Sequence, residues 1–113
     1  MSIATDLASI QILSSVYQST NVNDTFHNTV HTLCNKVDYI DWAGIYLKEG
    51  EDTRLLVSTE DKGSMQSQLA FPIKHNDTEV GVLVVKSKQW IVFDVTDVST
   101  LEKVTSELGK VFT

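Results

Sequence analysis

One segment, EVGVLVVKS at residues 79–87, constrains the fold of this chain more than any other. Successive side chains of a β-strand point to opposite faces. Both sets are apolar here: Val80, Val82 and Val84 on one face, Leu83 and Val85 on the other. A strand of this kind requires cover on both faces. We therefore expect it inside a layered fold, with helices over one face and a loop, a ligand or a partner over the other.

Three helices are predicted from apolar residues that recur every three or four positions. The first, with Thr5 or Asp6 as N-cap, carries Leu7, Ile10, Leu13, Val16 and Tyr17. The second begins near Asn23, ends near Lys36-Val37, and carries Phe26, Val30, Leu33 and Val37. The third follows Phe93-Asp94 with Asp94 or Thr96 as its cap, and its stripe is Val98, Leu101, Val104, Leu108 and Val111.

Three further strands are predicted between the second and the third helix, at 42–47, 54–58 and 69–74. A polar loop, residues 59–67, separates the second of these strands from the third. Pro72 has no N–H to donate, so its strand is expected at a sheet edge or at a bulge. Because the turns are short, the order α-α-β-β-β-β-α predicts an α+β fold built on one antiparallel sheet.

The composition limits both the architecture and the class of function. The chain has 113 residues, which predicts a single domain over 1–113. Its formal net charge is −6 without any cluster of lysines or arginines, which disfavours nucleic-acid binding. No apolar run is long enough to cross a membrane, and the N-terminus lacks the basic segment of a secretory signal. With one cysteine, no internal disulfide can form, and we expect a cytoplasmic protein.

Several segments resemble the GAF domain family, and they occur in the family's order. They are the aromatic strand DWAGIYL (41–47), the strand pair LAFPIK and EVGVLVVKS, and FDVTDVSTLEKV (93–104) at the last helix. The pattern is most similar to the free methionine-(R)-sulfoxide reductase group of GAF proteins. The resemblance implies a central antiparallel sheet with the terminal helices mainly on one face and a lidded ligand pocket on the other. The lid of this chain would be short.

The chain departs from the reductases where their chemistry lies. Their lid segment holds the redox cysteines, whereas residues 59–68 of this chain contain no cysteine. Two carboxylate positions of the reductase pattern fall on Val84 and Lys86. Sulfoxide reduction by thiols needs a nucleophilic thiolate and usually a second thiol, and Cys34 is the only cysteine. We therefore expect a non-catalytic protein in which Cys34 acts as a small buried apolar residue.

The candidate ligand site is expected on the sheet face opposite the helices, and its predicted residues are Trp42, Tyr46, Phe71 and Lys86. Trp42 and Tyr46 share a strand face, which fits either ordinary sheet packing or the floor of an aromatic pocket. Lys86 either extends into solvent or places an ammonium group in that pocket, which would favour an anion. Phe71 opens a Phe-Pro-Ile segment similar to that of GAF-type receptors for small anions, including nitrate, in bacterial two-component signalling.

No cofactor and no metal site are expected. His27 and His31 are four positions apart and share a helix face. A third ligand is not evident unless Asp24 or Asn35 supplies it. His75 lies in a predicted turn and is expected to be exposed.

These features predict a sensory or regulatory module that binds a small ligand, such as the anion nitrate, or contacts a signalling partner such as a sensor kinase. One alternative is an enzyme similar to the free methionine-(R)-sulfoxide reductases, and another is a dimerisation or protein-interaction domain without a ligand. A homodimer is expected because the first and last helices carry more apolar surface than one small sheet face would cover. That surface comprises Ile10, Leu13 and Tyr17 with Leu101, Val104 and Leu108.

Overall fold

The computed structural model describes residue 12 and residues 22–61, 63–90 and 92–111. The helix α2 spans Val22–Lys36, and four strands follow it: β1 (Trp42–Glu49), β2 (Asp52–Ser58), β3 (Ser67–His75) and β4 (Thr78–Ser87). The helix α3 spans Val95–Leu108 and continues into a 3₁₀ turn, Gly109–Val111. The second and third predicted helices and all four predicted strands are therefore confirmed. The predicted first helix lies outside the described residues, apart from the buried Ile12.

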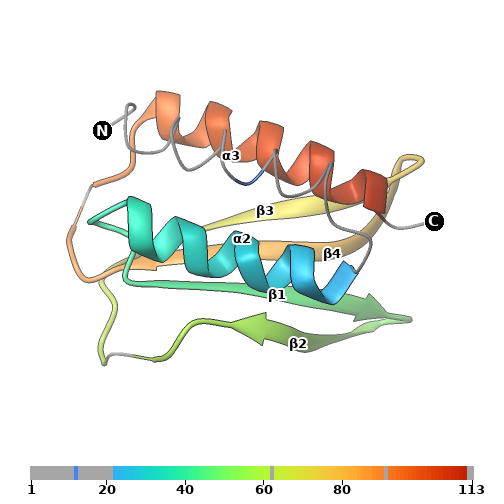
Figure 1. Cartoon of the computed structure of the whole chain (residues 1–113), viewed down its shortest axis with the longest axis horizontal. Coiled ribbons are helices and arrows are strands. Elements are labelled where there is room, and N and C mark those ends of the chain that lie inside the picture. The colour runs from blue at the N-terminus through green and yellow to red at the C-terminus, as the bar shows by residue number, and fades with distance from the viewer. Residues whose placement is uncertain (1–11, 13–21, 62, 91, 112–113) are drawn as a thin grey trace.

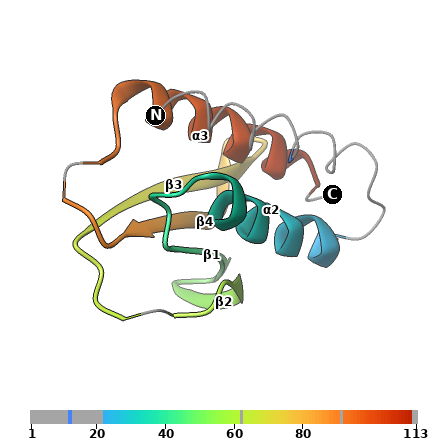
Figure 2. The ribbon, with the colours of Figure 1, turned by 60° about the vertical axis from the view of Figure 1, so that its left-hand side comes forward.

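The four strands form one antiparallel sheet in the order β2-β1-β4-β3. The helix α2 packs on β1 and β2, and α3 packs on β3. Both helices lie on the same side of the sheet (Figures 1 and 2). The predicted α+β fold is therefore confirmed. The strand β4 is internal, and β3, which contains Pro72, is an edge strand as its missing N–H predicts.

The hydrophobic core fills the space between the sheet and the two helices. Alternate residues of three strands point into it: Ala43, Ile45, Phe71, Ile73, Leu83 and Val85. The predicted helical stripes meet them with Phe26, Val30 and Leu33 from α2, with Val37 directly after α2, and with Leu101, Val104 and Leu108 from α3. Each of these helical side chains is at most 1% exposed, so their burial is completed within the chain. Among the described helices, none is both long and apolar enough to span a membrane.

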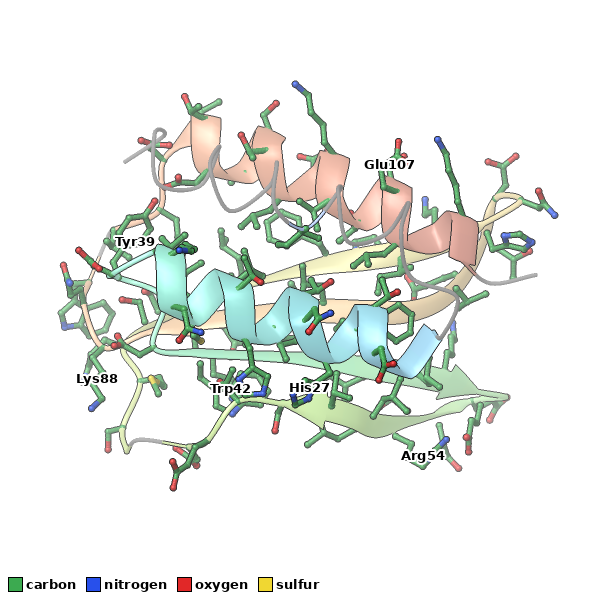
Figure 3. The ribbon with its side chains drawn as sticks, viewed as in Figure 1. His27, Tyr39, Trp42, Arg54, Lys88 and Glu107 are labelled. Atoms are coloured by element: carbon green, nitrogen blue, oxygen red, sulfur yellow. The ribbon has the colours of Figure 1, made fainter. Side chains whose placement is uncertain are left out.

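Asp94 caps α3, as predicted. Its carboxylate accepts a 2.8 Å hydrogen bond from the Asp97 backbone N–H, and the Asp97 carboxylate accepts a 3.2 Å bond from the Asp94 N–H. The bond from the Asp97 N–H lowers the pKa of Asp94 below its usual value, because it stabilises the charged carboxylate. The Tyr39 hydroxyl donates to Asp97 Oδ1 at 2.7 Å and so joins the segment after α2 to the start of α3 (Figure 3).

The other end of α3 is fixed to the β3–β4 turn. Gly109 lies so close to the Lys74 backbone that a Cβ atom there would stand 3.0 Å from the Lys74 carbonyl carbon. His75 Nδ1 lies 3.0 Å from the Gly109 carbonyl oxygen. His75 is therefore half-buried, and the expectation of an exposed side chain is wrong because the turn folds against the helix end.

Candidate functional site

Three polar or aromatic residues meet on the sheet face away from the helices. In the strand register Lys86 pairs with Trp42 on one side and with Gln68 on the other. Their sequence neighbours Ala43, Val85 and Leu69 contribute to the core on the helical face. Because side chains alternate along a strand, Trp42, Lys86 and Gln68 share the open face.

Trp42 and Lys86 are in direct contact. The Lys86 ammonium nitrogen lies 4.6 Å from the centroid of the indole ring, within the range of a cation–π interaction. The ring itself lies over Gly44, where an added Cβ would come within 2.9 Å of Trp42 Cζ2. Trp42 is only 7% exposed although it does not belong to the main core. Glycine at position 44 therefore provides the space in which the indole lies flat against the sheet.

The loop between β2 and β3 covers this end of the sheet. The Thr59 backbone N–H donates to the Ala43 carbonyl at 2.9 Å, and the Thr59 hydroxyl accepts a 3.0 Å bond from the Ala43 N–H. At the other end of the loop, the Gln66 N–H donates to the Ser87 carbonyl at 2.8 Å. The predicted cover for the second sheet face is therefore confirmed for this part of it.

A cavity of about 340 Å³ lies between this loop and the strands. Its described lining is Trp42, Asp61, Gly63, Met65, Gln68 and Lys86. Asp61 Oδ1 accepts a 3.0 Å bond from the Gly63 N–H, which shapes the loop into a turn beside the cavity. The walls therefore offer an ammonium group, a side-chain amide, an indole, a thioether and one carboxylate.

Lys86 carries the only positive charge in the described lining of this cavity. Within the described part of the chain, the Lys86 ammonium group contacts the Trp42 ring, and no carboxylate forms an ion pair with it. An aromatic ring leaves the donor capacity of an ammonium group largely unused. Lys86 is therefore available to donate hydrogen bonds to an acceptor in the cavity.

Two of the four predicted site residues line the cavity. Tyr46 shares the open face but lies four positions along β1 from Trp42 and does not belong to the lining. Phe71 does not line this cavity, and its predicted position on this sheet face is wrong. Phe71 pairs with Leu83, is 5% exposed and belongs to the core under the helices, because it alternates with Pro72 and thus points to the other face.

Sequence reasoning missed the remaining lining residues, Asp61, Gly63, Met65 and Gln68. Gln68 could have been found, since it shares the strand parity of Pro72 and pairs with Lys86. The three loop residues follow no periodic pattern, and their positions depend on the hydrogen bonds that fix the loop to β1 and β4.

Cys34 lies on the other side of the sheet from the cavity lining. It lies on α2 and packs against the core under the helices, but it is half-buried and not fully buried as expected. Its Sγ donates to the Thr59 hydroxyl at 3.5 Å. The sheet therefore separates the chain's one thiol from the indole and the ammonium group.

The two helical histidines lie close together without forming a metal centre. The rings of His27 and His31 have centroids 4.2 Å apart, and His27 points from α2 towards β2 (Figure 3). Asp24 and His27 line a shallow hollow with Leu56 and Val57. Among the described residues, no group of three histidine, cysteine or acidic side chains is placed to hold a metal ion.

A larger hollow, of about 980 Å³, lies along β3 and α3. Its lining includes the cations Lys74 and Lys110 but also the carboxylates Asp77 and Glu102. Lys110 Nζ is engaged by Glu107 at 3.0 Å. The two cations of this hollow are balanced by two carboxylates, and among the described residues the hollow has no counterpart of the contact between Lys86 and the Trp42 ring. We therefore take the smaller cavity beside Trp42 as the candidate site.

No family model matches the sequence, and no curated protein sequence matches it. Solved structures do resemble the chain. The free methionine-R-sulfoxide reductase from Neisseria meningitidis, in complex with its substrate, has a TM-score of 0.86 at 18% identity over 96% of this chain and 87% of that one. For the fRMsr of Staphylococcus aureus, also with substrate, the values are 0.85 and 18% over 96% and 95%.

The GAF domain of the Acinetobacter phosphoenolpyruvate-protein phosphotransferase also resembles the chain, with a TM-score of 0.82 at 17% identity over 92% of this chain and 89% of that one. The two reductases and this GAF domain thus match the same backbone about equally well. At such identities the likeness shows the fold alone. The chain therefore has a GAF-like α+β fold, as the sequence resemblance implied.

Proposed function

We propose that this chain is a non-catalytic, cytoplasmic sensory or regulatory GAF module that binds a small anion in the cavity beside Trp42. The observation that supports this most is the Lys86 ammonium group, which lines the cavity and has no ion-pair partner among the described carboxylates. The cavity volume of about 340 Å³ is at the small end of the range for ligand pockets. Ligand binding or release would alter the contact with a signalling partner such as a sensor kinase.

The composition of the cavity wall favours a singly charged ligand. Lys86 and the side-chain amide of Gln68 supply donors for an oxyanion, and the Trp42 ring supplies a flat apolar surface. Asp61 supplies the opposing charge and would repel a second negative charge on the ligand. A nitrate-sized monovalent anion satisfies these conditions, and so does the carboxylate of a small zwitterion whose ammonium group meets Asp61.

Replacement of Lys86 by methionine is expected to weaken anion binding by more than about tenfold, because a charge-assisted hydrogen bond contributes about 1.5–3 kcal/mol. The fold should remain intact, since methionine retains the apolar part of the side chain. Binding would be measured by a thermal-shift screen of inorganic anions, amino acids, methionine sulfoxide and nucleotides. A ligand at about a hundredfold excess over its Kd should stabilise the protein by about 2.7 kcal/mol.

The neighbouring Lys88 supplies a matched control. It is exposed, and its backbone N–H binds Asp41, so Lys88→Met removes one positive charge without touching the cavity lining. Tryptophan emission should be followed with Trp90→Phe as background, because Trp90 is 72% exposed and would obscure Trp42. If no common anion at millimolar concentration changes the melting temperature or the Trp42 emission, the anion proposal fails and partner contact becomes the first proposal.

We expect no thioredoxin-coupled reduction of free methionine-(R)-sulfoxide above background. The chain has one cysteine, and the sheet separates it from the cavity. A single thiol so placed cannot both attack a sulfoxide bound beside Trp42 and resolve the product. Turnover that disappears in Cys34→Ser would contradict this expectation and would establish the reductase alternative instead.

A further inference from the structure

The loop from β2 to β3 connects the two edge strands and passes the end of the sheet at which β1 begins and β4 finishes (Figure 1). The loop residues that line the candidate cavity lie between two points of attachment: Asp61, Gly63 and Met65. One attachment is the Gln66 backbone N–H, which donates to the Ser87 carbonyl at 2.8 Å. The other is Thr59, which uses its side chain as well as its backbone.

Thr59 attaches the loop to β1 by two hydrogen bonds with one residue. The register of β1 and β2 runs as far as Gly44 and Ser58, so Ala43 and Thr59 are the next residues to face each other. In a regular antiparallel pair both bonds join backbone groups. Here the Thr59 N–H donates to the Ala43 carbonyl at 2.9 Å, but the Ala43 N–H donates to the Thr59 hydroxyl at 3.0 Å. The side chain therefore takes the place of a backbone carbonyl, and the backbone can turn from β1 towards the cavity.

The hydrogen-bonding capacity of the Thr59 hydroxyl is fully used within the chain. Besides the bond from Ala43, the hydroxyl accepts from Cys34 Sγ of α2 at 3.5 Å, and it donates to the Ala43 carbonyl at 3.5 Å. A hydroxyl group has two acceptor sites and one donor. Thr59 is only 8% exposed, so loss of its hydroxyl would leave the Ala43 N–H without an acceptor in a place that solvent barely reaches.

The rest of the loop has little packing that could replace this attachment. Of the described residues at 60–66, Met65 is half-buried and the others are exposed. Segments with few buried contacts open locally at a low cost in free energy. The position of the loop over the cavity therefore depends on its attachments, and loss of one of them should displace the loop while the core remains packed.

We infer that Thr59 is a positioning residue of the candidate ligand site, whose hydroxyl holds Asp61 and Met65 in place as walls of the cavity. This inference rests on the proposed function, because the position of the loop matters to a ligand only if the cavity binds one. With the loop displaced, water would reach the Lys86 ammonium group. Attraction between an anion and this group would then weaken, because it falls as the local dielectric constant rises.

Acrylamide quenching of Trp42 fluorescence tests this inference without any ligand. A Trp90→Phe background leaves Trp42 as the one tryptophan of the chain. Thr59→Val keeps the shape of the side chain but removes the hydroxyl. It should raise the quenching constant at least about twofold, because the displaced loop uncovers an indole that is now 7% exposed. Thr59→Ser keeps the hydroxyl and should be quenched like the wild type.

Thr29→Val is the matched control. Thr29 lies on α2, is 1% exposed, and donates its hydroxyl to the Thr25 carbonyl at 2.8 Å, outside the cavity lining. This variant also loses a buried hydroxyl and its hydrogen bond, but its quenching should remain that of the wild type. Circular dichroism would show that each variant is folded. Unchanged quenching in Thr59→Val, or an equal rise in Thr29→Val, would overturn the inference.

Calorimetric titration with nitrate then tests whether the position of the loop matters to a ligand. Thr59→Val should weaken nitrate binding about fivefold or more, because the binding-competent position of the loop is only partly populated, and Thr59→Ser should restore it. Increased quenching with wild-type nitrate affinity would also overturn the inference, since the loop would then contribute nothing to binding. A wild type that binds no nitrate would count against the proposed function and not against the role of Thr59 in holding the loop, which the quenching decides.

Discussion

Replacing Gly109 with alanine is expected to lower the free energy of unfolding by about 3 kcal/mol. An added methyl group would collide with the Lys74 carbonyl oxygen of β3, and a backbone atom cannot rotate out of the way as a side chain can. Overpacking at a rigid contact costs about 1–3 kcal/mol, and this case belongs at the upper end. The helix α3 would have to withdraw from the sheet, which would also disrupt the approach of His75 Nδ1 to the Gly109 carbonyl.

The direction of the stability change in Gly109→Ala distinguishes a steric effect from an entropic one. Gly109 has φ −61° and ψ −26°, which any residue adopts, so conformational entropy alone would make alanine stabilising by about 0.4–1 kcal/mol. Urea unfolding would measure the difference, with Ser106→Ala at an exposed position of α3 as the control that should change little. A Gly109→Ala variant as stable as the wild type would show that the helix end is not held against β3 as the structure describes.

Most of the fold follows from periodicity in the sequence. The doubly apolar segment at 79–87 predicted a strand with cover on both faces, and Leu83 and Val85 of β4 do lie in the core under the helices. Its other face is only partly covered: Val82 and Val84 are half-buried on the open side of the sheet. The apolar pattern predicted that this face needs to be covered. It could not predict how much of the face the loop at residues 59–67 covers.

The wrong placement of Phe71 has a physical lesson. Leu69, Phe71 and Ile73 alternate with Ala70, Pro72 and Lys74, so strand parity alone places the larger apolar set in the core. The prediction followed the similarity of a Phe-Pro-Ile segment to anion receptors and overlooked this alternation. For Trp42 and Lys86, strand parity predicts the same sheet face for both side chains. The two residues also pair across the strands, and their side chains are in contact.

The homodimer prediction was based partly on the apolar side chains of α3, which were expected to be exposed. The structure shows that they are buried within the chain and so are not available for a dimer contact. Leu101, Val104 and Leu108 are at most 1% exposed within the chain, because both helices share a single sheet face and enclose the core between them. The other half of that argument rests on Ile10, Leu13 and Tyr17, which lie outside the described residues.

Replacing Gly44 with alanine is expected to destabilise the protein by about 1–3 kcal/mol and to open the candidate site. The Trp42 ring occupies the space above Gly44, and a Cβ atom there would lie within 3.0 Å of Trp42 Cζ3. The ring must then move off the sheet, away from Lys86 and towards solvent. In a Trp90→Phe background, the emission of Trp42 should shift to longer wavelength, because an indole that is now 7% exposed would become hydrated.

The variant Gly81→Ala is the control that distinguishes a specific effect on the candidate site from a general loss of stability. Gly81 lies on the same sheet, but its added Cβ would stand 2.5 Å from the Tyr46 carbonyl oxygen and would not touch Trp42. This variant should therefore lose comparable stability while its Trp42 emission and its response to an anion remain those of the wild type. If instead Gly44→Ala keeps both its stability and a short-wavelength emission, the indole is not packed against the sheet. Lys86 would then lack the aromatic neighbour that holds its ammonium group at the cavity, and the proposed anion site would lose its geometric basis.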